Sequence, residues 1–254
     1  MLILLAKLIY LIDKKHTKIA MVNLDIAFGN ILSKNEKIYI IKKSYQNLLL
    51  YLSDFIYNTG ISREELLKKV KFENLDIIEK YKDKNIIFIT AHYGNWELLS
   101  LSLGAFVKKI TIVGRDLDSL VMQKILRNHR EQFDIELVSK KGAIKHLIKA
   151  MNNNRAIGLL VDQNTSDRDG IIVNFFEKDV RHTPTAKLLA DKFEAVVIPV
   201  FITTDDYKNY NIKFYEPVVS TQEESDIIEK VIRDKPDEWF WFHRRWKNRY
   251  GDLY

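Results

Sequence analysis

The chain has 254 residues, of which 46% are hydrophobic, so it is long enough for one large domain with a sizeable core. It contains no cysteine, which excludes disulfides, zinc sites built from thiolates and a cysteine nucleophile. The formal net charge of +6 favours anionic partners: nucleic acid, anionic lipid or a phosphorylated substrate.

The chain begins with an apolar run over residues 1–12, which contains a single lysine. This run is too short to cross a bilayer as a helix, which needs about 20 apolar residues. No small-residue cleavage site follows, so we do not expect a signal peptide. Lys14, Lys15 and Lys18 come next. This order is typical of a helix on an anionic membrane surface, which we predict for residues 1–18; a helix packed on the domain is the alternative.

The next part of the chain carries two signals for helix starts. Ser33 with Glu36, and Ser62 with Glu65, have the spacing of capping boxes. The first predicts a long helix that ends near Tyr57, and the second predicts a shorter one.

From residue 85 onward, apolar runs of strand type alternate with helix-type segments. Strands are predicted at 85–90, 109–114, 135–139, 156–162, 171–176, 195–204 and 211–217. Helices are predicted at about 95–106, 118–132, 142–153, 184–194 (after Thr183 and Pro184) and 237–249, and Thr221 with Glu224 is predicted to cap one more. The alternation predicts an α/β fold with a mixed, largely parallel sheet flanked by helices. No linker is visible, so we expect a single domain over 1–254, with a helical part at 19–84 and a core at 85–254.

A histidine and a glutamate follow the first predicted strand of this core. His92 comes two positions after its end, and Glu97 stands five positions later, where helix-type sequence begins. A histidine at a strand end can act as a general base, and a nearby carboxylate can fix its tautomer. The alternative is a strand-to-helix turn with two partly buried polar groups.

Two small residues lie between them. Gly94 allows close approach of the backbone to a ligand. Asn95 could donate to a carbonyl oxygen or cap the following helix.

Polar groups also follow two further strands. Arg115 follows the second strand and offers a planar fork for phosphate, with a salt bridge to Asp116 or Asp118 as the alternative. Asp162 and Gln163 end the 156–162 run. Three polar strand ends are typical of a crevice at the carboxyl edge of a sheet.

Four blocks, in this order, resemble the lauroyl/myristoyl lipid A biosynthesis acyltransferases, which are part of the glycerolipid (lysophospholipid) acyltransferase superfamily and its H-x-x-x-x-D/E motif. The blocks are His92 to Glu97, Val113-Gly-Arg115-Asp-Leu-Asp-Ser, Val161-Asp162-Gln163 with Gly170-Ile-Ile-Val-Asn-Phe175-Phe176, and Trp241-Phe-His243-Arg244-Arg245-Trp246-Lys247. The resemblance runs from about residue 19 to residue 249.

The resemblance implies transfer of a fatty acyl chain from an acyl carrier protein thioester to a hydroxyl of a lipid A precursor, with no metal and no cofactor. His92 would be the base and Glu97 its orienter. Gly94, Asn95, Arg115, Asp162 and Gln163 would bind substrate. Asp162 could orient Arg115 or the acceptor sugar, or cap the next loop. The implied partners are acyl carrier protein, a phosphorylated glycolipid and an anionic membrane surface, with no nucleic acid. The implied location is the cytoplasmic face of the inner membrane, peripheral or weakly anchored.

Some residues of these blocks have two interpretations each. Phe175 and Phe176 are core residues or line an acyl chain. The basic run from Arg244 to Arg249 contacts phosphates or headgroups, or it is a solvated helix face.

Two other functions are kept open. An acyltransferase of the same superfamily could act on another glycolipid or a lysophospholipid. A basic nucleic-acid-binding module would account for the charge, but it leaves His92, Glu97 and the polar strand ends unexplained.

Overall fold

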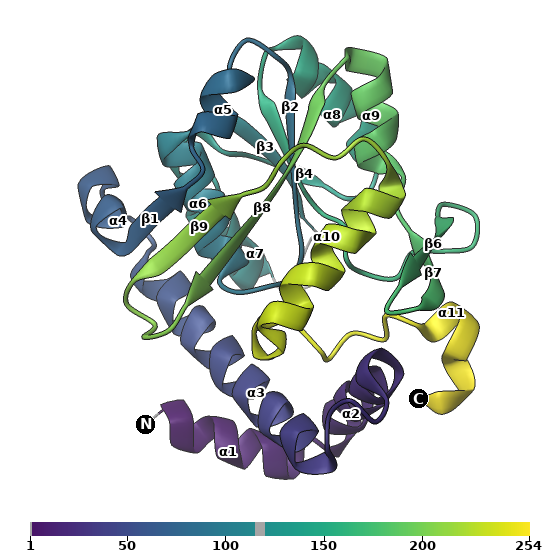
Figure 1. The fold of residues 1–254 in the computed structure, drawn as a ribbon. Coiled ribbons are helices and arrows are strands. Elements are labelled where there is room, and N and C mark those ends of the chain that lie inside the picture. The colour runs from purple at the N-terminus through teal and green to yellow at the C-terminus, as the bar shows by residue number, and fades with distance from the viewer. Residues whose placement is uncertain (1, 115–119) are drawn as a thin grey trace.

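The computed structural model describes residues 2–114 and 120–254. Within them, a seven-stranded sheet forms the centre of the molecule, with strand order β1-β9-β8-β2-β5-β3-β4 (Figure 1). Its strands are β1 (Val70–Glu73), β2 (Ile86–Thr90), β3 (Ile110–Gly114), β4 (Glu136–Ser139), β5 (Ala156–Leu160), β8 (Val196–Thr204) and β9 (Tyr210–Phe214). The strands from β8 to β4 are parallel to one another, whereas β9 runs antiparallel to β8 and parallel to β1. The predicted mixed, largely parallel sheet is confirmed.

A separate hairpin lies beside the main sheet. It consists of β6 (Ile171–Phe175) and β7 (Lys178–His182), which pair antiparallel. The sequence interpretation missed β7 and also missed β1, which lies in the part expected to be helical. Both are short strands outside the buried centre of the sheet, so their sequences lack the continuous apolar run of β2.

Helices cover both faces of the sheet. They are α1 (Leu2–Ile12), α2 (Lys14–Phe28), α3 (Lys34–Tyr57), α4 (Arg63–Lys69), α5 (Asp76–Lys80), α6 (Trp96–Phe106), α7 (Leu120–Arg130), α8 (Ala143–Asn152), α9 (Thr185–Phe193), α10 (Thr221–Asp234) and α11 (Lys247–Tyr250). In β2, Ile86 and Phe88 pack in one core cluster and Ile87 and Ile89 in another. Burial on both faces explains why this strand is apolar throughout.

Two predicted helix starts are confirmed by their caps. Ser33 and Glu36 form a capping box at α3, and Ser62 and Glu65 form one at α4. The start of α10 is one residue earlier than expected, because the side chain of Ser220 accepts the capping hydrogen bond. A capping box needs only residues close in sequence, so it can be recognised without the tertiary fold.

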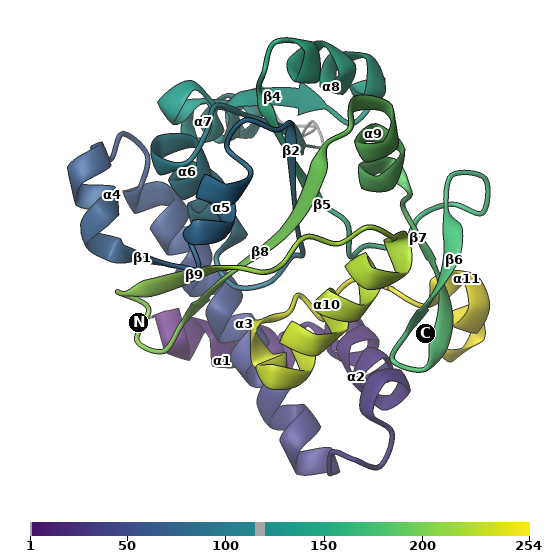
Figure 2. The same ribbon diagram turned by 45° about the horizontal axis from the view of Figure 1, so that its top comes forward.

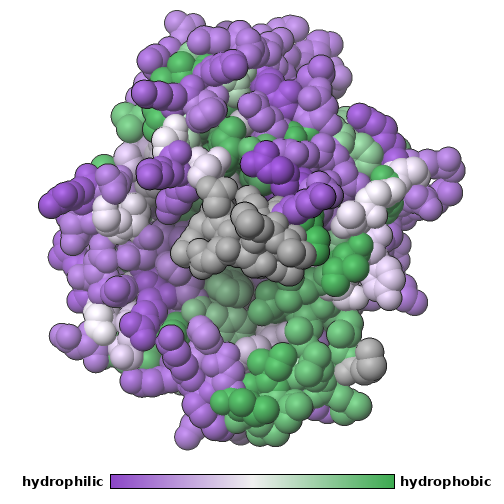
Figure 3. Space-filling model, turned by 180° about the vertical axis from the view of Figure 1, so that it is seen from behind, coloured by the Kyte–Doolittle hydropathy of each residue, from purple (hydrophilic) through white to green (hydrophobic). Residues whose placement is uncertain are grey.

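The N-terminal segment does not form a single helix over residues 1–18. Asp13 separates α1 from α2, and its side chain accepts from the backbone N–H of His16. With α3, these helices gather at one end of the sheet (Figures 1 and 2). Ala6 of α1 is buried, whereas Leu4, Leu8 and Leu11 are 69%, 52% and 59% exposed. One side of α1 therefore packs on the domain, and the other leaves an apolar surface (Figure 3). No helix among the described residues has the length and apolar character needed to cross a membrane.

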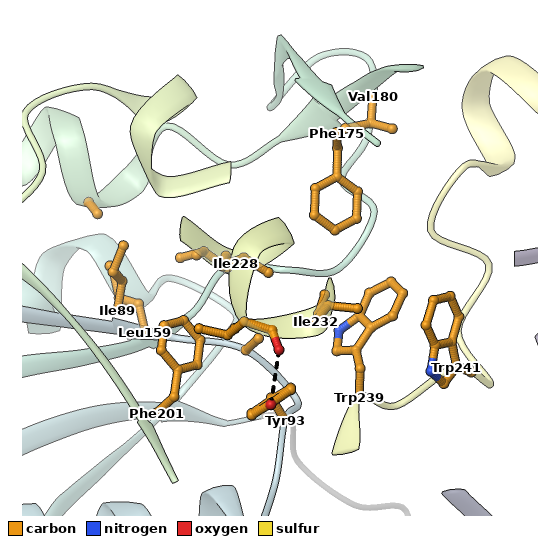
Figure 4. Close-up of a cluster of buried hydrophobic side chains, with 14 of the residues drawn as sticks. Ile89, Tyr93, Leu159, Phe175, Val180, Phe201, Ile228, Ile232, Trp239 and Trp241 are labelled. Carbon is orange, nitrogen blue, oxygen red and sulfur yellow. Dashed lines mark hydrogen bonds between the residues drawn. The ribbon is translucent and has the colours of Figure 1, made fainter. Parts of the chain in front are cut away.

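The predicted helix over 237–249 is wrong. The structure has a short 3-10 turn at Pro236–Glu238, a β-bridge at Trp239, turns over 241–246, and α11 at Lys247–Tyr250. Trp239, Trp241 and Trp246 are each at most 2% exposed. Trp239 and Trp241 lie side by side in the core near Phe175 (Figure 4). All three indoles can be buried only if this segment passes through the core. An amphipathic helix on the surface buries only one of its faces, so it could not bury all three.

Candidate active site

The site lies at the carboxyl edge of the two central strands. Because β2 and β5 are parallel neighbours, with Thr90 opposite Leu160, the residues that follow them meet at one edge. His92 and Asp162 do so: His92 Nδ1 lies 2.8 Å from Asp162 Oδ1. The His92 side chain is 24% exposed, whereas the Asp162 side chain is 3% exposed. A buried carboxylate therefore holds a histidine that solvent can reach.

Both oxygens of Asp162 are occupied. The indole Nε1 of Trp239 donates to Asp162 Oδ2 at 2.8 Å. Burial raises the pKa of the Asp162 carboxyl, but the charge and hydrogen bond of His92 and the indole donor outweigh burial and lower that pKa to about 2. Asp162 is therefore a carboxylate at neutral pH, and it accepts a hydrogen bond from His92 Nδ1–H. The unprotonated Nε2 is left as the basic nitrogen.

The C-terminal segment fixes the backbone around His92. Phe240 donates its backbone N–H to the carbonyl of His92 at 2.9 Å, and Gly94 donates to the carbonyl of Glu238 at 3.0 Å. Tyr93 and Trp239 form an antiparallel β-bridge between these bonds. Residues more than 140 positions apart thus form one small ribbon at the site, and this ribbon brings the Trp239 indole to Asp162.

Gln163 lies on the other side of the imidazole. Its amide nitrogen is 3.2 Å from His92 Nε2. The next residue, Asn164, donates its backbone N–H to Nε2 of His243 at 3.0 Å. Burial lowers the pKa of His243 to about 4, so this second histidine is neutral at physiological pH. The arrangement is that of a general base with a fixed tautomer, flanked by neutral polar groups.

Comparison with known proteins shows the family of the chain. The sequence model of the family described as bacterial lipid A biosynthesis acyltransferase matches residues 2–248. The chain belongs to that family. It is similar to the lipid A biosynthesis acyltransferase of Haemophilus influenzae, with 24% identity over 94% of this chain and 79% of the relative. It is also similar to the lipid A biosynthesis lauroyltransferase of Escherichia coli, with 21% identity over 96% of this chain and 83% of that relative.

Membership of the bacterial lipid A biosynthesis acyltransferase family makes this protein an enzyme that transfers acyl groups. The resemblance stated from the four sequence blocks is confirmed. The roles of single residues are a separate matter, and several of these residues make contacts other than the expected ones.

Glu97 pairs with Arg130 instead of His92. Its Oε2 accepts from Nε of Arg130 at 2.9 Å, its Oε1 accepts from Nη2 of Arg130, and Oε1 also accepts from the indole of Trp96 at 3.2 Å. The expected contact with the imidazole is wrong, because Asp162 holds Nδ1 and Gln163 holds Nε2. Burial raises the pKa of Glu97, but its pairing with Arg130 outweighs burial, and the pKa is below its usual value.

Arg130, which the sequence interpretation missed, is the ion-pair partner of Glu97. It stands 33 residues after Glu97, on α7, in a stretch whose composition is that of an ordinary basic helix end. Nothing in its local sequence distinguishes it from Arg127, so only the packing of α7 against α6 reveals the pair.

Gly94 and Asn95 shape the turn after His92. Gly94 has a φ of +60°, and a Cβ there would lie 1.9 Å from the carbonyl oxygen of Ile202 on β8. Close approach to β8 therefore explains this glycine. Asn95 is 1% exposed; its Oδ1 accepts from the backbone of Leu98 at 3.2 Å, and its Nδ2 donates to Asp54 at 3.2 Å. Asn95 caps α6, which is one of its two expected roles, and its contact with substrate stays a prediction.

Of the remaining predicted residues, Arg115 lies outside the described part of the chain. Asp162 is hydrogen-bonded to His92 Nδ1, a contact that neither of its expected functions included. Phe175 and Phe176 are core residues, each 2% exposed. Arg245 is 1% exposed and donates to the carbonyl of Gln163 at 3.3 Å, so it is neither a headgroup contact nor part of a solvated face.

We predict that Arg130→Ala lowers the free energy of unfolding by about 3–5 kcal/mol, because it leaves the Glu97 carboxylate buried without its partner. The side chains of this pair are only 17% and 16% exposed. Urea unfolding followed by circular dichroism measures the change. Arg127→Ala is the matched control: Arg127 pairs with Glu131, the residue directly after α7, but at 49% and 39% side-chain exposure, so we expect a loss of at most about 1 kcal/mol. Equal losses in the two variants would contradict a structural role for the Glu97–Arg130 pair.

Proposed function

We propose that this acyltransferase moves a fatty acyl chain from an acyl carrier protein thioester to a hydroxyl of a phosphorylated lipid A precursor, at the cytoplasmic face of the inner membrane. The observation that carries the proposal is the pairing of a partly exposed His92 with the buried Asp162, in a chain of this family. Both relatives are named for lipid A biosynthesis, and one is named a lauroyltransferase.

In the proposed reaction His92 is the general base. Its Nε2 takes the proton of the acceptor hydroxyl while the hydroxyl oxygen attacks the thioester carbonyl carbon. A C–O bond forms, the C–S bond breaks, and the imidazolium returns the proton to the leaving sulfur. The Asp162 carboxylate stabilises the imidazolium between these steps. Glu97 acts indirectly, by holding Arg130 and the Trp96 indole.

Aromatic side chains beside His92 support an acyl substrate. The ring of Trp96 lies 5.3 Å from the imidazole, the ring of Phe240 lies 6.3 Å from it, and the two aromatic rings are 6.2 Å apart. Both are only partly buried. They offer apolar surface at the point where the thioester carbonyl must lie.

Cationic side chains at the same edge support a phosphorylated acceptor. Lys140 and Lys141 follow β4 and are exposed, and the backbone N–H of Lys140 donates to the carbonyl of Gly114 at the end of β3. Arg115 would add a bidentate contact, and we keep it as a proposed phosphate ligand.

An assay of the purified protein tests the function. Acyl carrier proteins loaded with saturated chains of several lengths are offered with lipid A precursors, other glycolipids and lysophospholipids, and products are read by mass spectrometry. We expect acylated lipid A precursor. Acylation of a lysophospholipid alone would instead support the second hypothesis, an acyltransferase of the wider superfamily.

The exposed face of α1 gives a prediction for membrane binding. Leu4, Leu8 and Leu11 share one side of the helix, and exposed Lys14 and Lys15 follow. We expect the protein to co-sediment with anionic vesicles. Binding should weaken as salt rises, because each basic residue near the surface contributes on the order of 1 kcal/mol and salt screens that term.

The triple variant Leu4→Ser, Leu8→Ser and Leu11→Ser should lose the part of binding that resists salt, because apolar burial provides that part. In the matched control, serine replaces three exposed apolar residues outside α1: Leu188, Val219 and Leu253, at 62%, 71% and 52% exposure. Equal sedimentation of both triple variants at high salt would show that α1 is not the membrane contact.

A further inference from the structure

The side chain of Gln163 occupies the position that a reacting hydroxyl needs. Asp162 accepts a hydrogen bond from His92 Nδ1–H, so the lone pair of the neutral imidazole is on Nε2. The Gln163 amide nitrogen lies 3.2 Å from that Nε2 and donates into the lone pair. A hydroxyl that gives its proton to the same nitrogen must lie at hydrogen-bond distance from it, about 3 Å away. The amide and the hydroxyl therefore compete for one place.

The backbone of Gln163 is fixed on both sides. Its carbonyl accepts from Arg245, which is 1% exposed. Asp162 before it has both carboxylate oxygens bonded, and Asn164 after it donates its N–H to His243. Movement of Gln163 is thus restricted to its side chain, which is partly exposed. The amide of this side chain is hydrogen-bonded to His92. Rotation about the side-chain torsions of Gln163 is enough to break that hydrogen bond and release the imidazole.

A free base next to a thioester would also activate water. In both reactions the C–S bond breaks and the proton taken by His92 returns to the sulfur. An acceptor hydroxyl gives an ester, whereas water gives a fatty acid and wastes the donor. A bound acceptor has further contacts that hold its hydroxyl in place, so it displaces the amide more readily than a single water molecule does.

We propose that Gln163 masks the His92 base until the acceptor hydroxyl binds, and so directs the acyl chain to that hydroxyl instead of water. This inference rests on the proposed function, since it assumes a thioester donor and a hydroxyl acceptor at this site. It makes Gln163 a residue that sets the choice between transfer and hydrolysis.

The test compares hydrolysis with transfer in Gln163→Ala and Gln163→Met. Methionine keeps the length of the side chain and removes the N–H donor. Hydrolysis of acyl carrier protein thioester is measured without acceptor, and transfer is measured with saturating lipid acceptor. We expect hydrolysis to rise about fivefold in both variants, the factor expected for one net hydrogen bond, and transfer to change less than twofold.

Gln222→Ala is the matched control. Gln222 lies on α10 and bonds to the backbone of Asn174 and to Asp226, so its removal also breaks hydrogen bonds of a glutamine side chain. We expect this variant to keep the wild-type ratio of hydrolysis to transfer.

Two results would overturn the masking role. Hydrolysis could stay at the wild-type rate in both Gln163 variants, or hydrolysis and transfer could fall together, as they would if Gln163 only supported the fold. Failure of the proposed function has a different signature: the wild-type protein would acylate none of the lipid acceptors. Masking would still be judged from hydrolysis, which needs only the thioester.

Discussion

His92→Ala should lower acyl transfer by at least about a hundredfold and leave the fold intact. Loss of a general base typically costs 10²–10⁴-fold, and no other described side chain takes the place of Nε2 at this strand end. His92 is partly exposed, and its bonds are to side chains of the site and to the backbone of Phe240. Because the backbone bond survives the substitution, the variant should fold. Turnover of acyl carrier protein thioester with a lipid acceptor, together with thermal unfolding, measures both expectations.

A matched control separates the loss of a base from the loss of a histidine. His146 lies exposed on α8, so His146→Ala should keep wild-type turnover. If folded His92→Ala retained near wild-type turnover, the proposed mechanism would be wrong, although membership of the family would stand.

Asp162→Asn should be nearly as severe, with a loss of roughly 10²–10⁴-fold in kcat. The asparagine oxygen can still accept from the Trp239 indole, so the packing should survive. The asparagine amide, however, donates toward His92 Nδ1 and favours the tautomer with its proton on Nε2. The base then presents a proton to the acceptor hydroxyl instead of a lone pair. Steady-state kinetics should show a loss in kcat that exceeds any change in KM.

Glu97→Gln is the comparison that decides between the two carboxylates. Glutamine keeps the shape of Glu97 and weakens its pairing with Arg130, so we expect lower stability and a smaller loss of kcat than in Asp162→Asn. A larger loss of kcat in Glu97→Gln than in Asp162→Asn would show that Glu97, and not Asp162, is the carboxylate on which the base depends.

Local sequence signals determined most of the helices and strands. The capping boxes at Ser33 and Ser62 involve residues three positions apart, and they form as expected. The buried strands are apolar on both faces, so β2, β5 and β8 are visible as short apolar runs. Edge and hairpin strands such as β1 and β7 have no such run, and they depend on the strand beside them.

The sequence by itself also determined that His92 stands at a strand end and that the chain resembles an acyltransferase family, because both follow from residues in short blocks. The tertiary structure decided which carboxylate serves the histidine. Glu97 is five positions from His92 and points to Arg130, whereas Asp162 is 70 positions away and meets His92 because β2 and β5 are adjacent. Trp239, 77 positions from Asp162, completes the site from the C-terminal segment. The order of the strands in the sheet and the position of the buried Trp239 indole depend on packing across the whole domain. The spacing of residues within a motif carries no information about either.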